Sequence, residues 1–401
     1  MSIDNSNDFS SPLPPEFEDI LNFDAYIPHY LLLVILDNEK NVDRNYFINS
    51  TLYCLTNLKY FLEFLYKCDD QKLDKLPFKV LNQTIKQIID NIKNGKSEYN
   101  SNVFTKFILE KIKLFENQSY RNPRFLIDCI LNKFFLLNNS NDIPSFNSIS
   151  SISNETNISF LSQLSLDSNN SDINFSVKES YGIERNTYVE DKLSIVIKKT
   201  RKCSNKNCGK TENLYEYMAT LHFNLKDTNK EYSLYDCFNE FLNKKNDANG
   251  ICSNCSKKNI CTERSLFYEF PESIIIFIFY GKEEKNKEFI KFNYNFEEII
   301  DFSNVNDKLV DDNLKNKKYF LSSLIACKFP KVEKDPNKDE GELFYTFCRK
   351  DQDSKFVVYN EDFILDNRIV KKQIQKLKDE KHDPKKSYPF VLIYTSIKDK
   401  K

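Results

Sequence analysis

Two close pairs of cysteines form the strongest chemical pattern in this chain. Cys203 and Cys208 are separated by Ser-Asn-Lys-Asn, and Cys252 and Cys255 are separated by Ser-Asn. Four thiolates in two short knuckles suit tetrahedral Zn²⁺, because each knuckle lets two sulfurs reach about 2.3 Å from one ion. A metal enclosed by four cysteines has no open position for a substrate, so we expect structural zinc. Cys261 is a candidate substitute ligand, and free thiols without a metal are the alternative.

Composition is typical of a folded protein from a reducing compartment. The chain has 401 residues, 40% hydrophobic and 14% aromatic, enough to build one multi-part domain or two domains. Its net charge of -1 leaves no bulk field that would draw it to nucleic acid or to an anionic membrane. Eleven cysteines behind an acidic, polar N-terminus predict thiols and metal ligands in the cytoplasm or nucleus. No apolar run approaches the roughly 18 residues of a membrane span, so no membrane partner is expected.

Helical and strand patterns occupy different parts of the chain. Residues 1–26 have the composition of a flexible acidic tail, and residues 138–173 form a Ser/Asn-rich insertion that is too polar to order itself. Apolar spacing predicts an amphipathic helix over residues 46–66 and further helices before the insertion. Short alternating strands dominate after it, with one helical stretch at residues 233–242. Strands that follow helices predict an α+β fold.

A second motif lies near the N-terminus and reads Asn41-Val-Asp-Arg-Asn-Tyr46-Phe-Ile-Asn-Ser50-Thr-Leu-Tyr-Cys54-Leu55. It resembles the cysteine box of the ubiquitin-specific proteases, N-x-G-x-T-C-[YF]-M-N-S-x-L-Q-C-L. The alignment places the nucleophilic cysteine on Tyr46 and the oxyanion-stabilising residue on Asn41. A phenol, with an unperturbed pKa of about 10, is a poor substitute for a thiolate that forms near neutral pH.

The resemblance extends through the cysteine pairs to the last strand. The family order SLxDCLxxF, CxxC and LPxxLxxxL is matched by residues 233–241, by the second cysteine pair and by residues 270–278. The closing segment 388–394 is similar to the family's AYxLxY strand. The resemblance implies a papain-like ubiquitin-specific protease fold over residues 27–398, with a helical thumb, a β palm and zinc-bearing β fingers at 195–275. In the family these fingers grip the globular body of ubiquitin.

The family's histidine box, G-H-Y-x-A-[YF]-x-[RK], corresponds to residues 342–349. The general base falls on Leu343, which has no proton to exchange, while Asn360 keeps the position of the residue that orients the base. The resemblance therefore implies four degenerate catalytic positions, Asn41, Tyr46, Leu343 and Asn360. An orienting residue and an oxyanion donor cannot transfer an acyl group without a nucleophile and a base.

Substitutes for the missing groups are scarce. The three histidines, His29, His222 and His382, all lie outside the box. Cys54 lies on the apolar stripe of the expected helix, where a small core residue is the usual role.

A third family motif, Q-Q-D-A-x-E-F-L, is matched by residues 119–126 and places Arg121 where relatives hold an acid against the cationic tail of ubiquitin. Attraction would become repulsion there.

These residues predict a catalytically inactive relative of the ubiquitin-specific proteases that binds or scaffolds proteins. The implied partner is ubiquitin, a ubiquitin-like protein or another protein, within a larger complex. A divergent active deubiquitinase is one alternative. A zinc-dependent, nucleic-acid-associated assembly factor such as a splicing component is the other, suggested by the basic run at residues 198–210. That run has no RNA-binding signature, so nucleic acid is not the expected partner.

Overall fold

The computed structural model describes about half of the chain, in segments spread from residue 32 to residue 397. They are residues 32–34, 46–58, 61, 83–84, 86–87, 98–100, 102–111, 115, 121–137, 178–180, 193–225, 231–246, 252, 254–256, 261–280, 293–328, 343–349, 352–354, 356–360, 363–364 and 387–397. The expected tail at 1–26, the insertion at 138–173, and Asn41, His29 and His382 lie outside these residues. No helix among the described segments is long and apolar enough to cross a membrane.

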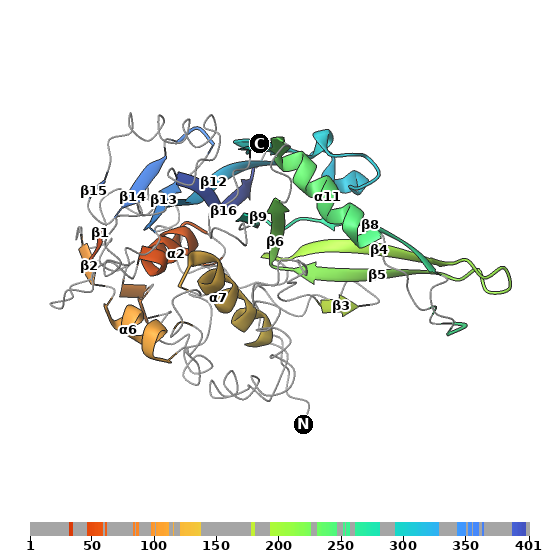
Figure 1. The fold of residues 1–401 in the computed structure, drawn as a ribbon, viewed down its shortest axis with the longest axis horizontal. Coiled ribbons are helices and arrows are strands. Elements are labelled where there is room, and N and C mark those ends of the chain that lie inside the picture. Colours follow the sequence, from red (N-terminus) through yellow and green to blue (C-terminus); the bar gives the residue numbers. More distant parts are fainter. Residues whose placement is uncertain are drawn as a thin grey trace, which may run out of the picture.

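An eight-stranded sheet forms the centre of the molecule (Figure 1). Its order is β15-β14-β13-β12-β16-β9-β6, with β11 also paired to β12. The strands are β6 (Thr220–Leu225), β9 (Ser273–Tyr280), β11 (Ile299–Asp301), β12 (Lys318–Lys328), β13 (Leu343–Cys348), β14 (Val357–Asn360), β15 (Phe363–Ile364) and β16 (Ser387–Ser396). The apolar run of β9 suits its place between β16 and β6, because residues 274–278 are fully buried whichever face they point to.

A four-stranded antiparallel sheet, here called the arm, extends away from the large sheet (Figure 1). Its order is β3-β5-β4-β8, with β3 (Lys178–Ser180), β4 (Ile195–Cys203), β5 (Thr211–Met218) and β8 (Cys261–Glu269). The base of the arm joins the main core, where Ile197 and Phe267 are fully buried. Two short parallel pairs complete the sheets, β1 (Leu32–Val34) with β2 (Glu98–Asn100) and β7 (Glu231–Ser233) with β10 (Asn293–Asn295).

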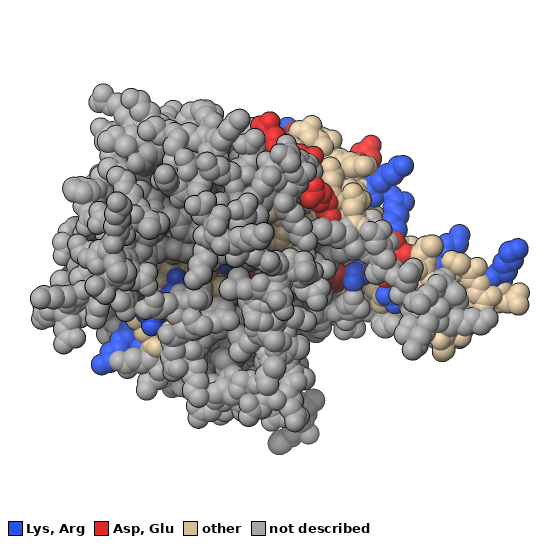
Figure 2. Space-filling model, viewed as in Figure 1, with Lys and Arg blue, Asp and Glu red and all other residues tan. Residues whose placement is uncertain are grey.

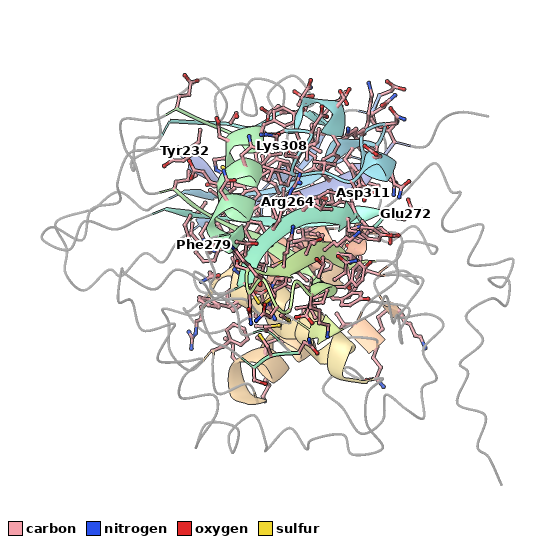
Figure 3. The ribbon with its side chains drawn as sticks, turned by 90° about the vertical axis from the view of Figure 1, so that its right-hand side faces the viewer. Tyr232, Arg264, Glu272, Phe279, Lys308 and Asp311 are labelled. Carbon is pink, nitrogen blue, oxygen red and sulfur yellow. The ribbon has the colours of Figure 1, made fainter. Side chains whose placement is uncertain are left out.

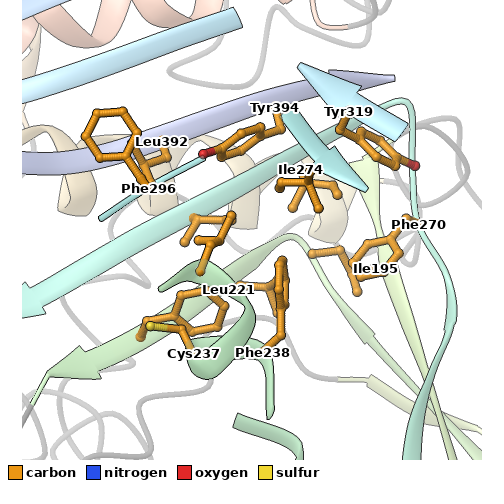
Figure 4. Packing of buried hydrophobic residues seen from close by; sticks show 14 of the residues in the cluster. Ile195, Leu221, Cys237, Phe238, Phe270, Ile274, Phe296, Tyr319, Leu392 and Tyr394 are labelled. Carbon is orange, nitrogen blue, oxygen red and sulfur yellow. The ribbon is translucent and has the colours of Figure 1, made fainter. Parts of the chain in front are cut away.

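Helix α11 (Leu234–Asn246) forms where the sequence predicts a helix and covers one face of the arm. A reciprocal cap starts it: the Ser233 hydroxyl donates to the Asp236 carboxylate at 2.7 Å, and the Asp236 amide donates back to that hydroxyl at 3.1 Å. The Phe241 ring stacks on Phe267 of β8, with centroids 6.2 Å apart and planes 5° apart. Figure 4 shows Phe238 of the same helix in the main core.

Helices α2 (Tyr46–Thr56), α6 (Asn102–Lys111) and α7 (Pro123–Leu137) form a second group (Figure 1). The helix expected over 46–66 begins at Tyr46 but ends at Thr56, so its predicted length is wrong. The Thr56 hydroxyl donates to the carbonyls of Leu52 and Tyr53, and the Asn57 amide donates to Ser323 Oγ on β12 at 2.8 Å. Side chains that bond the backbone or a neighbouring strand in this way compete with helix continuation.

Candidate functional site

The far end of the arm carries the four cysteines of the two sequence pairs. Their sulfurs all lie within 4.8 Å of one another, with Cys203 and Cys255 at 3.8 Å and Cys208 and Cys252 at 3.6 Å. A tetrahedral zinc with bonds of about 2.3 Å would place its sulfurs about 3.8 Å apart. The thiols are therefore spaced as the ligands of one tetrahedral metal ion.

Local turns bring the two cysteines of each pair to the same side of their loop. In the first knuckle the amides of Cys208 and Gly209 both donate to the Asn205 carbonyl, and Gly209 has a φ of 57°. That left-handed conformation is easiest for glycine. In the second knuckle the Ser256 amide donates to the Cys252 carbonyl at 2.8 Å. Each pair is thus folded back on itself by hydrogen bonds within a few residues.

Hydrogen bonds to sulfur favour thiolates at part of this cluster. Backbone amides of Cys255 and Asn254 lower the pKa of Cys252 to about 6. The Asn254 side-chain amide donates to the sulfur of Cys208 at 3.4 Å and lowers the pKa of that thiol. Burial raises the pKa of Cys203 to about 12, so this thiol needs the charge of a metal to ionise. The cluster fits a divalent metal that displaces protons from thiols.

The basic run around the first pair is largely committed to ion pairs. Lys199 Nζ lies 3.0 Å from the buried Glu216 carboxylate, and Arg201 lies 2.8 Å from Glu263, which is also buried. Lys210 Nζ lies 3.7 Å from Glu212, Lys202 and Lys206 are exposed, and Figure 2 shows blue side chains at this end of the arm. The run therefore serves mainly to hold β4 against β5 and β8.

The two segments that carry positions matched to catalytic residues, α2 and β13, lie against each other. Tyr46 is the first residue of α2 and Leu343 the first of β13, and α2 lies against β13 (Figure 1). The Ser50 hydroxyl donates to the Phe344 carbonyl, and the Thr346 hydroxyl donates to the Ser50 carbonyl, both at 3.2 Å. Tertiary folding thus joins the two boxes of the sequence analysis at one place.

Strand β14 brings the third position to the same sheet. It pairs with β13 through Thr346 and Tyr359, and Asn360 is the next residue and the last of β14. The segments that hold the three matched positions are therefore neighbours, because α2 packs on β13 and β13 pairs with β14. Tyr46, Leu343 and Asn360 occupy these positions.

Two cysteines close to this place are core residues. Cys54, two turns further along α2, is fully buried, and Cys348 on β13 is 4% exposed. Burial raises the pKa of the Cys54 thiol well above its usual range and that of Cys348 to about 12. Ser323 donates to Cys348 at 3.5 Å. Neither thiol has the exposed, electropositive surroundings of a reactive cysteine.

His222, the one histidine in the described part of the chain, belongs to a different cluster. It lies on β6, where its Nε2 is 2.9 Å from the Thr220 hydroxyl and 3.9 Å from the Asp128 carboxylate. Its ring contacts Phe277 and Phe279. Burial, with a smaller contribution from the nearby Arg124 charge, lowers its pKa to about 3.

Arg124 ties α7 to the large sheet and was not singled out by the sequence. Its guanidinium carbon lies 3.5 Å from the centre of the Phe390 ring and 4.1 Å from that of Phe279, and Nη1 donates to the Ile278 carbonyl at 2.8 Å. Arg121, the residue matched to the family's acid, donates to the Phe115 carbonyl at 2.7 Å. Hydrophobic periodicity in the sequence does not predict a contact between one helix and two distant strands.

The arm face opposite α11 carries a half-buried aromatic group, here called the open face. Because strand side chains alternate, Lys198, Tyr215 and Leu266 point away from the face that Phe267 presents to α11. Tyr268 joins them, with its ring 5.3 Å from Tyr215 and 5.5 Å from Lys198 Nζ.

A basic side chain borders the open face. Arg264 donates to the Lys308 carbonyl at 2.9 Å, and Figure 3 labels both residues. In Figure 1, α11 lies on one side of the arm and α7 lies on the other, below its base. The open face is therefore turned away from α11, toward the side on which α7 lies.

Comparison with known families decides the assignment. Residues 83–335 match the sequence profile of the ubiquitin carboxyl-terminal hydrolase family. The chain belongs to this family. The matched span begins after Tyr46 and ends before Leu343, so it includes neither of these residues. A search of curated proteins found no match.

Solved structures agree with the hydrolase family in fold. The SAGA DUB module of Ubp8, Sgf11, Sus1 and Sgf73 bound to monoubiquitin matches with a TM-score of 0.56 at 13% identity, over 92% of this chain and 70% of that chain. A second Ubp8 module matches at 0.52 with 14% identity, over 96% and 72%. A yeast SAGA DUB module matches at 0.50 with 15% identity, over 92% and 69%. The predicted α+β ubiquitin-specific protease fold is confirmed.

Proposed function

We propose that this hydrolase-family chain is a pseudo-deubiquitinase that binds ubiquitin or a ubiquitin-like protein without cleaving it. The observation that carries the proposal is the junction of α2 with β13. The backbone there brings together the two segments matched to the family's catalytic boxes, and in the sequence these segments carry Tyr46 and Leu343 at the positions matched to nucleophile and base. A phenol and an alkyl side chain supply neither a thiolate nor a general base.

The proposal includes one structural Zn²⁺ held by Cys203, Cys208, Cys252 and Cys255. It is supported by the tetrahedral spacing of the four sulfurs and by the soft thiolate ligand set. Such an ion would link the hairpin of β4 and β5 to the second knuckle and so stiffen the end of the arm. A stiff arm costs less entropy when it docks against a partner.

The proposed docking surface is the open face. The two half-buried tyrosines fit the centre of an interface, where aromatic side chains are enriched. The Ubp8 structure bound to monoubiquitin supports ubiquitin as the partner class. Its Sgf11, Sus1 and Sgf73 subunits support a role within a larger protein complex, which we place in the cytoplasm or nucleus.

Binding can be tested by titrating ubiquitin into the zinc-loaded protein and recording NMR shifts or heat. We expect a Kd of tens of micromolar, about -6 kcal/mol. Tyr215→Ala should weaken binding about tenfold, since a central tyrosine contributes about 1–2 kcal/mol. Asn243→Ala is the matched control, because Asn243 is exposed on α11, which covers the other face. Equal loss in both variants, or no binding at all, would remove ubiquitin from the proposal.

The proposed absence of ubiquitin cleavage needs a separate assay. The protein should leave ubiquitin chains intact and should not react with a ubiquitin probe that carries a thiol-directed warhead. Labelling that a single cysteine substitution abolishes would identify a working nucleophile and establish the active alternative. Binding and cleavage are independent readouts, so either half of the proposal can fail alone.

A further inference from the structure

Five thiols, not four, gather at the end of the arm. Cys261 packs with Cys203 and Cys252 in one buried cluster, against which Cys208 and Cys255 also pack. Cys261 is 4% exposed, and Cys203 and Cys252 are each 3% exposed. Since a tetrahedral metal takes four sulfurs, one thiol is left over.

The backbone fixes Cys261 beside the metal position. It is the first residue of β8 and lies directly opposite Cys203, the last residue of β4. Directly opposed residues of antiparallel strands have Cβ atoms about 4.5–5.5 Å apart. Their sulfurs can therefore approach to the edge length of a zinc tetrahedron, about 3.8 Å.

The five thiols differ in how open they are to solvent. Cys203, Cys252 and Cys261 form a buried floor, whereas Cys208 and Cys255 are half-buried and lie on the solvent side. A reagent from solvent meets the two outer thiols first. The floor would then still supply three sulfurs, and the remaining outer thiol a fourth.

We propose that Cys261 is a reserve metal ligand that enters the coordination shell when Cys255 or Cys208 is lost. One metal–sulfur bond breaks at the outer cysteine and one forms at Cys261, which gives up its proton to solvent, so the tetrathiolate is restored without any redox change. The ion stays bound after damage that would open a four-cysteine site. The contrasting role for Cys261 is a small apolar residue that only fills the floor.

Cobalt(II), loaded in place of zinc, reports the number of sulfur ligands through its charge-transfer absorbance. Cys255→Ser should keep the intensity of the wild-type protein, because Cys261 replaces the lost sulfur. Cys255→Ser with Cys261→Ser should lose about one quarter of it, in proportion to the lost bond. Cys261→Ser alone should match the wild-type protein. Cys255→Ser with Cys237→Ala is the thiol-matched control, since Cys237 lies on α11 in the main core.

The proposal is overturned if Cys255→Ser alone loses as much intensity as the double variant. A second measurement needs no substitution of an outer cysteine. Zinc-loaded wild-type protein and Cys261→Ser are each alkylated at one outer thiol, confirmed by mass spectrometry, and zinc release is followed with a chromogenic chelator. We expect release to be several-fold slower in the wild-type protein. Equal release rates would show that Cys261 does not bind the metal.

Discussion

Acidification should destabilise this protein through His222, whose imidazole is buried between α7 and the large sheet. The ring contacts Phe277 and Phe279, and Arg124 and Asp128 of α7 face it. These surroundings disfavour the protonated imidazole. Its pKa in the folded protein is lowered from 6.5 to about 3, first by burial and then by Arg124. In the unfolded chain the same ring protonates near its ordinary pKa of about 6.5.

The unfolded state therefore binds more protons than the folded state between pH 6.5 and about 3. Stability rises with pH wherever this is so, and the stabilisation is complete above the unfolded pKa. The slope reaches about 1.4 kcal/mol per pH unit only well below pH 6.5, where the unfolded ring is fully protonated, so the change from pH 6.5 to about pH 4.5 should cost about 2 kcal/mol. For a domain of ordinary stability this is a large share of the free energy of unfolding.

Two other groups must be separated from His222. Burial raises the pKa of Asp128 well above its usual range, so Asp128 contributes stability at low pH that is lost as pH rises, opposite in sign to His222. The pKa of Asp301 is lowered to about 2 by its pair with Lys318, so its contribution disappears only below pH 3.8. The window from pH 6.5 to about 4.5 is therefore clear of Asp301 but not of Asp128.

Urea unfolding followed by far-UV circular dichroism measures the effect, since the chain has no tryptophan. His222→Gln keeps a hydrogen-bond partner for Thr220 and cannot be protonated. The wild-type protein should lose about 2 kcal/mol more than this variant between pH 6.5 and about 4.5. The comparison is repeated in an Asp128→Asn background. Equal pH slopes for wild type and His222→Gln in both backgrounds would refute the reasoning.

Four further predictions concern the site and the arm. Tyr46→Cys alone should restore little ubiquitin cleavage, because Leu343 still supplies no base; turnover of a fluorogenic ubiquitin substrate checks this. Freshly purified protein should contain one zinc per chain, and its removal by a chelator should lower the thermal midpoint; elemental analysis without zinc would contradict this. Ser233→Ala should cost about 1 kcal/mol in urea unfolding through loss of the α11 cap, and it should still destabilise a background of Asp236→Ala, because the backbone amide of residue 236 still donates to the Ser233 hydroxyl. Removing the C-terminal tail of ubiquitin should change the Kd little, because Arg121 replaces the acid that would attract that tail; strong dependence on the tail would mean that this motif is misaligned.

Much of the fold could be read from local pattern. The apolar run of β9 predicts a buried strand, and the pattern at residues 233–242 predicts a helix; both are confirmed, by β9 and by α11. The end of α2 could not be read this way. Apolar spacing continues past Thr56, but Asn57 donates to residues of β12 that lie far away in sequence. Periodicity carries no information on such a partner.

The metal site, like the fold, could be predicted from the sequence only in part. The two cysteine knuckles predict a metal site because each folds through hydrogen bonds within a few residues, and the structure needs only to bring two pairs together. Cys261 belongs to neither of the two close cysteine pairs in the sequence. Its place in the cluster comes from the register of β4 against β8, which is fixed by pairing along the whole arm.

The sequence by itself determined what chemistry this protein can offer: a tetrathiolate site, and Tyr46 and Leu343 at the positions that the family resemblance assigns to nucleophile and base. Side-chain identity sets acidity and nucleophilicity, so these conclusions need no coordinates. Only the tertiary structure decided that α2 meets β13, that Arg124 lies between Phe279 and Phe390, and that Cys261 packs against the two cysteine pairs. These contacts join segments far apart in the chain, and they depend on how complete helices and sheets pack rather than on any local run of residues.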